Sequence, residues 1–128
     1  MRRVVFSTLL LGAVVLSTAA LGAATKKPTV SFSEDIFPIL QIRCQSCHQA
    51  GHEGYERSGL KLDSYEDLMK GTKFGRIVEP GDEATSNLMV LLDGRADKSL
   101  QMPHGKKRLS ICDRNAIRTW IHEGALNN

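Results

Sequence analysis

The chain has 128 residues, of which 41% are hydrophobic, 24% are charged and 5% are aromatic. This length suits one small domain, and this composition excludes a disordered or collagen-like chain. The formal net charge is +3, but Arg2 and Arg3 belong to an N-terminal segment that we expect to be removed, which leaves 15 basic against 14 acidic residues. That balance leaves no basic stripe to neutralise a row of phosphates, so we predict no nucleic-acid binding.

The N-terminal residues have the pattern of an export signal. Arg2 and Arg3 precede an apolar run over residues 4–16, and small residues continue to Ala24 before the chain turns polar. This order predicts a signal peptide over residues 1–24, cleaved after Ala24. The run also nearly reaches the length of a membrane span, so an uncleaved anchor is the alternative. In both cases we expect an exported, periplasmic protein, attached to a membrane only if the segment remains.

Residues 25–30 are predicted to be a linker, and residues 31–128 to be a single domain. The first expected helix begins near Ser33, a capping residue that is followed by two acids. Pro38 lies several residues further on and lacks the N–H that an interior helical residue donates. The helix therefore either starts near Pro38 or bends there, and it leads directly into Cys44.

The polar stretch 49–58 contains two glycines and predicts a loop. After it, Asp63 or Ser64 is placed to cap a short helix over residues 65–70. Gly71 follows as a natural end for that helix.

Two further helices are expected in the C-terminal half. Thr85 or Ser86 caps the first, which carries a leucine-rich segment. Ser110 and Asp113 have the spacing of a capping box for the second, and Gly124 ends it. Its expected apolar side comprises Ile111, Ile117, Trp120 and Ile121. No convincing set of strands is visible, so the sequence predicts an all-α fold.

The most informative motif is Cys44-Gln45-Ser46-Cys47-His48. Two thiols three positions apart can each add to one vinyl group of a haem, and the histidine that follows is placed against the iron. This spacing is typical of c-type haem attachment. The motif predicts one covalent haem c, bound by Cys44 and Cys47, with His48 as an iron ligand.

Two other interpretations of the cysteines are considered. A redox-active disulfide would normally open a helix after a strand, and no such setting is visible. A structural zinc site would need four ligands, drawn from Cys44, Cys47, Cys112 and His122. Cys112 and His122 lie ten residues apart on one predicted helix, which is too far for one ion.

A six-coordinate haem needs a second axial ligand. The donors available are Met69, Met89, Met102, His52, His104 and His122. Met89 lies among leucines and is expected to pack in the core. Met102 precedes Pro103 in a loop, where a stiff backbone can present the sulfur to the iron. A Met/His pair would raise the reduction potential relative to bis-His ligation. The residues alone leave the choice of ligand open.

Several segments besides the haem motif carry a family resemblance: 35–40, 59–63, 77–82, 86–88, 102–103, 120–121 and 124–125. Through them the chain resembles a small class I cytochrome c, in particular the Planctomycete-type cytochrome c domain. The resemblance implies helices packed around one haem, with Met102 as the distal ligand. One position departs from the family pattern. His104 stands where a second proline is common, and it would either compete with Met102 for iron or hydrogen-bond a haem propionate.

Together these features predict a single-electron carrier that exchanges electrons with redox partner proteins. With both axial positions filled we expect no catalytic residues and no enzymatic activity. The alternatives are a haem sensor or peroxidase-like enzyme with a labile distal ligand, and a cytochrome subunit of a larger redox complex.

Two surface features complete the predictions. Cys112 is an odd thiol, for which we favour a small buried side chain over pairing with another chain. The basic run 106–108 follows Met102. It is either a solvated loop or, if it lies at the haem edge, a docking site for an acidic redox partner.

Overall fold

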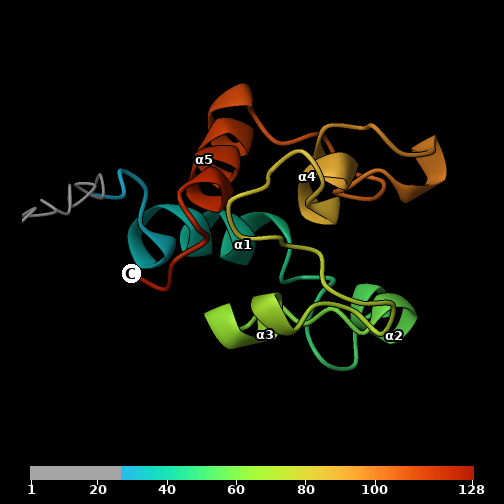
Figure 1. The fold of residues 1–128 in the computed structure, drawn as a ribbon. Coiled ribbons are helices and arrows are strands. Elements are labelled where there is room, and N and C mark those ends of the chain that lie inside the picture. The colour runs from blue at the N-terminus through green and yellow to red at the C-terminus, as the bar shows by residue number, and fades with distance from the viewer. Residues whose placement is uncertain (1–26) are drawn as a thin grey trace, which may run out of the picture.

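The computed structural model describes residues 27–128, so the predicted signal peptide lies outside the described residues. Within 27–128 the chain forms five short α-helices and no strand, and the sole β feature is an isolated bridge between Thr72 and Gly75 (Figure 1). The all-α prediction is therefore confirmed. In this range no helix has the length and apolarity needed to cross a membrane.

The first helical segment is a π-helical turn, η1 (Phe32–Ile36), that continues into α1 (Phe37–Arg43). The hydroxyl of Ser31 caps η1 by accepting a hydrogen bond from the backbone N–H of Glu34 at 3.3 Å. Pro38 lies in the first turn of α1, where its missing N–H costs nothing. The α-helix thus starts near Pro38, which was one of the two expectations. The helical segment as a whole is capped by Ser31 and not by Ser33.

Helix α2 (Glu53–Ser58) lies within the stretch that was predicted to be a loop, and that prediction is wrong. No residue of α2 is buried, so the sequence carries no apolar periodicity there. Its local contacts include an exposed ion pair between Arg57 and Glu53 at 2.9 Å. Gly59, with φ of 73°, ends the helix.

Helices α3 (Tyr65–Lys70) and α5 (Ile111–His122) begin where the sequence predicts. The Ser64 hydroxyl accepts a hydrogen bond from the N–H of Asp67 at 3.0 Å. Both halves of the capping box are present at α5, between Ser110 and Asp113. Side chains that satisfy the free N–H groups thus mark both helix starts.

Helix α4 (Asn87–Leu92) follows Ser86, whose hydroxyl does not cap the helix. The Ser86 side chain is fully buried and instead bonds to the loop before it. Its hydroxyl accepts from the N–H of Glu79 and donates to the carbonyl of Asp82, both at 2.8 Å. A single buried hydroxyl therefore holds residues 79–82 against the start of α4.

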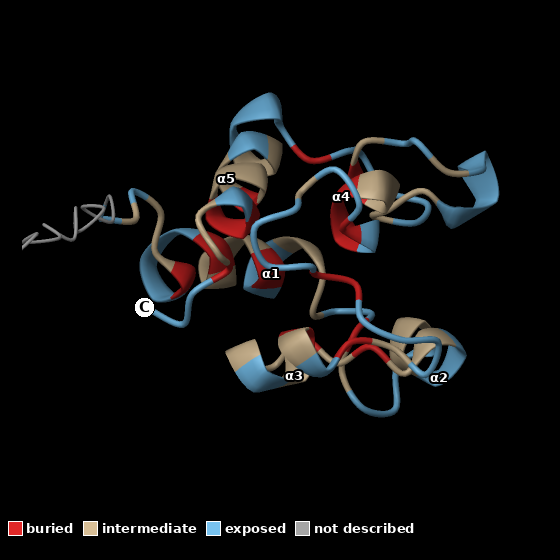
Figure 2. Cartoon of the chain, in the orientation of Figure 1, coloured by how far each residue is buried: buried red, intermediate tan, exposed pale blue. Residues whose placement is uncertain are grey.

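The apolar core lies between α5, α1 and the turn before it, and extends to α4 (Figure 2). The ring centroid of Phe32 lies 5.5 Å from that of Trp120 and 5.2 Å from that of Tyr65. The polar ends of these rings are satisfied, since Tyr65 Oη and Trp120 Nε1 donate to the carbonyls of Ala125 and Leu126, each at 2.8 Å. This cluster joins the C-terminal tail to the rest of the domain.

Two sequence expectations fail on the first turn of α5. Ile111 is 68% exposed, and Cys112 is exposed as well. Ile111 was expected on the apolar side of this helix and Cys112 as a small buried side chain, but both lie on the exposed side of the turn. The preference for a buried Cys112 is therefore wrong.

The two ends of the described chain lie side by side (Figure 1). The backbone N–H and hydroxyl of Thr29 donate to the carboxylate of Glu123 at 2.8 and 2.7 Å. The N–H of Phe32 donates to the side-chain oxygen of Asn128 at 2.8 Å. The segment before η1 is thus held against the C-terminal tail.

Candidate functional site

A cavity of about 410 Å³ lies between the cysteine motif, α2, α4 and the loop before α5. Cys44, Cys47 and His48 all line it, together with Met102 and His104. Most of its remaining wall is apolar and includes Leu60, Leu62, Ile77, Leu88, Leu91 and Leu92. This size and lining suit a largely apolar ligand with a few convergent polar contacts.

The end of α1 brings the three motif side chains together. Cys44 is the residue at which α1 ends. Its carbonyl accepts hydrogen bonds from the N–H groups of both Cys47 and His48, each at 3.1 Å. The tight turn formed by these bonds places both thiols and the imidazole at one cavity.

The imidazole of His48 has a defined tautomer. Its Nδ1 lies 3.2 Å from the carbonyl oxygen of Leu60, which can only accept, so Nδ1 carries the proton and donates it. Nε2 is left with a free lone pair, the arrangement found in metal-binding histidines. Burial lowers the pKa of His48, and the bond to Leu60 only partly opposes this. The ring is therefore held neutral and able to bind iron.

Gly54 allows α2 to approach the motif closely. A Cβ atom at this position would lie 2.8 Å from the carbonyl oxygen of Cys47 and 3.1 Å from Cε1 of His48. The first distance is too short for a Cβ atom, and the second would be a tight contact. Gly54 also lines the cavity. This role was not visible in the sequence, because a glycine in a polar stretch indicates only a loop.

Cys44 differs from the thiols of redox disulfides. Burial raises its pKa to about 11, although the positive charges of Arg43 and Lys106 oppose the rise. Catalytic thiols of Cys-x-x-Cys motifs have lowered pKa values instead. Residues 27–128 also contain no strand from which such a motif would extend. The structure thus gives the redox-disulfide interpretation no support.

The structure also gives the zinc interpretation no support. Cys112 lies on α5, is exposed and does not line the cavity. Across the described residues, no group of three or more His, Cys, Asp or Glu side chains is arranged to bind a metal ion.

Of the distal donors considered, only Met102 and His104 line the cavity with His48. The others are accounted for elsewhere: Met89 is fully buried in the core, Met69 packs against the core, His52 precedes α2 on the surface, and His122 bonds Glu83 at 3.1 Å. The expectation that Met89 packs is thus confirmed. The structure narrows the choice of distal donor to two residues.

The loop that carries Met102 is held at both sides of the cavity. It contains a 3₁₀ turn, η2 (Lys98–Leu100). The N–H of Met102 donates to the carbonyl of Leu91 in α4 at 3.3 Å. On the motif side, Arg43 Nη2 donates to the carbonyl of Lys107 at 2.7 Å. The contact of Arg43 was not visible in the sequence, because it joins residues 64 positions apart.

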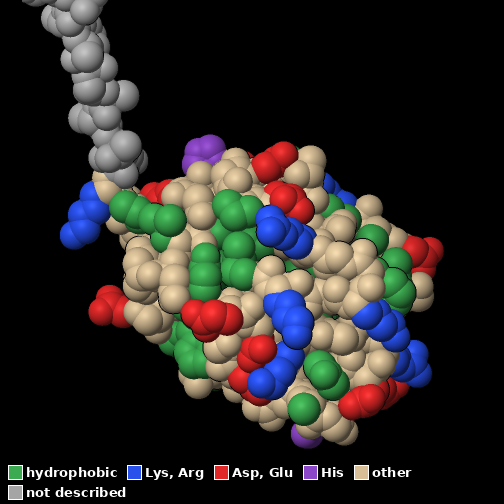
Figure 3. Space-filling model, turned by 60° about the horizontal axis from the view of Figure 1, so that its bottom comes forward, with side chains coloured by type: hydrophobic (Ala, Val, Ile, Leu, Met, Phe, Trp, Pro, Cys, Tyr) green, Lys and Arg blue, Asp and Glu red, His purple; other side chains and the backbone are tan. Residues whose placement is uncertain are grey.

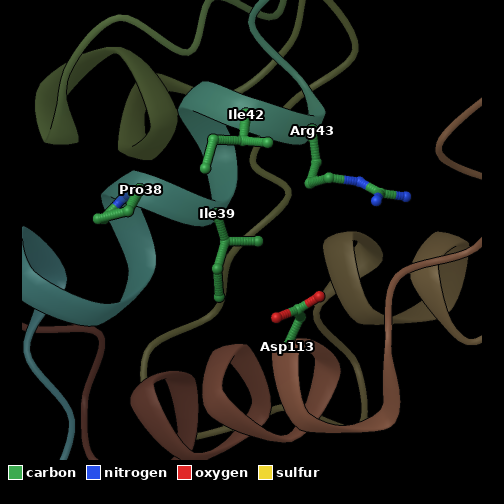
Figure 4. Close-up of a pocket in the computed structure, with 5 residues that line it drawn as sticks. All are labelled: Pro38, Ile39, Ile42, Arg43 and Asp113. Atoms are coloured by element: carbon green, nitrogen blue, oxygen red, sulfur yellow. The ribbon is translucent and has the colours of Figure 1, made fainter.

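A second, smaller cavity of about 190 Å³ lies between α1 and the start of α5 (Figure 4). Pro38, Ile39, Ile42 and Arg43 line it from α1, and Asp113 lines it from α5. It holds no thiol, thioether or imidazole, so it offers none of the donors that the larger cavity brings together.

With the cavity described, comparison with known proteins becomes informative. Residues 44–104 match the Planctomycete cytochrome C family. The matched segment runs from the first cysteine of the motif to His104, so it contains every donor assigned above. This confirms the predicted family resemblance. No curated protein and no solved structure matches the chain.

The match indicates that residues 44–104 are similar to a family of haem-binding electron-transfer proteins. The residues present fit a haem. Two thiols, an imidazole with a free Nε2 and a thioether converge on one apolar cavity, and the α2 glycine leaves room beside the motif.

Proposed function

We propose that the protein is an exported single-electron carrier with one haem c. Cys44 and Cys47 hold the haem through thioether bonds, and His48 and Met102 are its axial ligands. One observation carries the proposal: all four side chains line the same cavity although Met102 lies over 50 residues from the motif.

The bound haem would supply the one-electron chemistry, since its iron cycles between the ferrous and ferric states. The chain supplies the surroundings. The Leu60 carbonyl orients His48, and the leucines of α4 keep water from the haem face. A thioether ligand and an apolar wall both favour the reduced state and raise the potential.

The attachment motif occurs once in the sequence, which supports a single haem. The apolar N-terminal segment supports export to the periplasm, with membrane attachment only if it is retained. Partners would be redox proteins, either in transient contact or in a larger complex. Basic and acidic side chains are interspersed on the face shown in Figure 3. This face therefore offers no continuous basic surface for a nucleic acid.

The experiment that tests the proposal combines a pyridine haemochrome spectrum with the intact mass of periplasmically expressed protein. We expect one covalent haem per chain and the loss of residues 1–24. Replacing Cys44 and Cys47 together by alanine should abolish attachment. Cys112→Ala is the matched control, and it should leave attachment intact because Cys112 does not line the cavity. Wild-type protein without covalent haem would refute the proposal.

A haem sensor or peroxidase-like enzyme is the second candidate function. It is favoured by one observation: Met102 is only half-buried and lies in a loop, so its bond to iron would be easier to break than that of His48. Binding of carbon monoxide to the unmodified ferrous protein would support this candidate. Exclusion of carbon monoxide would support the electron carrier.

A further inference from the structure

We infer that His104 is a second distal donor, which takes the iron position when the sulfur of Met102 is withdrawn. This inference rests on the proposed haem site and concerns the regulation of that site. The distal side of the cavity would then carry two exchangeable ligands, whereas the proximal side carries one.

The first argument is position. Met102, Pro103 and His104 are consecutive, and all three line the cavity that His48 lines. No other histidine of residues 27–128 does so apart from His48 itself. His104 is therefore the one imidazole available to the distal side, and the amine of Lys106, which also lines the cavity, is bonded to the Ser46 hydroxyl at 2.9 Å.

The second argument is freedom of the side chain. Among the described residues, His48 bonds the Leu60 carbonyl and His122 bonds Glu83. The imidazole of His104 makes no comparable hydrogen bond or ion pair within residues 27–128 and is exposed at the cavity rim. No hydrogen bond or ion pair of its ring within residues 27–128 has to be broken before it binds.

The third argument is reach. The N–H of Met102 is anchored to Leu91, so the loop is fixed to α4 at that point. Two residues of chain span at most about 7 Å. Rotation of residues 103–105 can therefore exchange the donors without moving the α4 wall. Gly105 follows His104 with φ of 65° and open space around it, so it does not obstruct that rotation.

The exchange balances without a co-reactant. The bond between iron and the Met102 sulfur breaks, and a bond between iron and a neutral His104 nitrogen forms. Neither electrons nor net charge change. Because bis-His ligation gives a lower potential than Met/His ligation, the exchange lowers the reduction potential of the site.

The test compares purified holoproteins: wild type, Met102→Leu, His104→Ala and the double variant. Leucine keeps the apolar volume of methionine but offers no donor. We expect Met102→Leu to lose the near-infrared sulfur-to-iron band, to remain low-spin with a lowered potential, and to exclude carbon monoxide. The double variant should become high-spin and bind carbon monoxide, while His104→Ala alone should retain the wild-type spectrum.

His52→Ala in the Met102→Leu background is the control, because His52 is exposed and lies away from the cavity. It should stay low-spin, and dilution of the protein should not alter its spectrum. Far-UV circular dichroism and haem content establish that each variant folds, and His104→Asn provides a second substitution.

The outcomes separate the two proposals. If Met102→Leu is high-spin and binds carbon monoxide as readily as the double variant, the inference about His104 is wrong while Met102 stands as the ligand. If Met102→Leu keeps the wild-type spectrum and potential, Met102 is not the ligand, and both proposals are wrong.

Discussion

The side chain of Lys106 donates a hydrogen bond to the hydroxyl of Ser46, with 2.9 Å between Nζ and Oγ. Ser46 lies between the two cysteines of the motif, and Lys106 lies four residues after Met102. This bond and the one from Arg43 to the Lys107 carbonyl therefore join the distal loop to the attachment turn. The two sides of the proposed haem site are tied together at the cavity edge.

Removing the Lys106 bond should loosen the distal loop. In Lys106→Met we expect the Met102–iron band to disappear at a lower temperature or denaturant concentration than in the wild type, while haem attachment is unchanged. The effect should be at most about 1 kcal/mol, because both groups are exposed. The measurement is a thermal or denaturant titration of that band.

Lys107→Met is the matched control, since it makes the same change in charge but removes no side-chain hydrogen bond of the structure. If both substitutions destabilised the Met102–iron band equally, the loss of charge and not the loss of the hydrogen bond would be the cause.

Replacing Gly54 by alanine should impair the site. The new Cβ would lie 2.8 Å from the Cys47 carbonyl oxygen, so either α2 or the motif has to shift. We expect a loss of about 1–3 kcal/mol in the free energy of unfolding and a lower yield of holoprotein. Glu56→Ala, on the exposed face of the same helix, should change neither. Normal haem content and stability in Gly54→Ala would contradict the close approach.

Asp93 connects the end of α4 to α5 through Arg114 and Arg118, each at 2.9 Å. Burial by itself would raise the pKa of Asp93, but hydrogen bonds from Arg118 and Arg114 outweigh it and hold the pKa below its ordinary value of 3.8. The folded state therefore favours the ionised carboxylate. This contribution is complete above about pH 4 and is lost as the pH falls through the lowered value.

Asp93→Asn should accordingly reduce the free energy of unfolding by about 1–2 kcal/mol at pH 7. The difference from wild type should shrink as the pH falls below 3.8. Denaturant titrations of both proteins at a series of pH values measure this difference in the free energy of unfolding. Effects of pH that are common to both proteins cancel in the difference. Glu56→Gln makes the same charge change on the exposed part of α2 and should show no such trend. A difference that grows toward low pH would contradict the assigned sign.

Ser86→Ala should destabilise the wall formed by α4. The Ser86 hydroxyl is fully buried and is the acceptor for the N–H of Glu79. Its removal leaves that N–H and the carbonyl of Asp82 without this partner, which costs about 1–3 kcal/mol. Chemical denaturation measures the loss. A change no larger than that of the exposed Ser99→Ala would show that water replaces the hydroxyl.

Local signals in the sequence located several elements correctly. Pro38, Ser64 and the Ser110–Asp113 pair act on the backbone within one turn of themselves, so their effect can be inferred without the fold. The cysteine motif is local in the same way, because the five residues from Cys44 to His48 contain both the proposed attachment thiols and the proposed proximal donor. Helix α2 was missed because no residue of it is buried, so it has no periodic pattern to detect.

The distal side required tertiary structure. Helical spacing predicted burial for Ile111, and the usual burial of free cysteine favoured it for Cys112. Burial depends on which neighbours cover a residue, and both of these side chains are exposed. For the same reason the residues alone left the distal ligand open, and the fold placed two of the six candidate donors at the cavity.

The sequence by itself determined that the chain is helical, that it carries one haem-attachment motif and that His48 follows the second cysteine. Only the tertiary structure decided that His48 keeps its Nε2 free and lines an apolar cavity, and that Met102 and His104 share that cavity. The residues of an attachment motif are neighbours along the chain, so the sequence alone brings them together. The two axial ligands come from distant segments, and packing between those segments sets the distance between them.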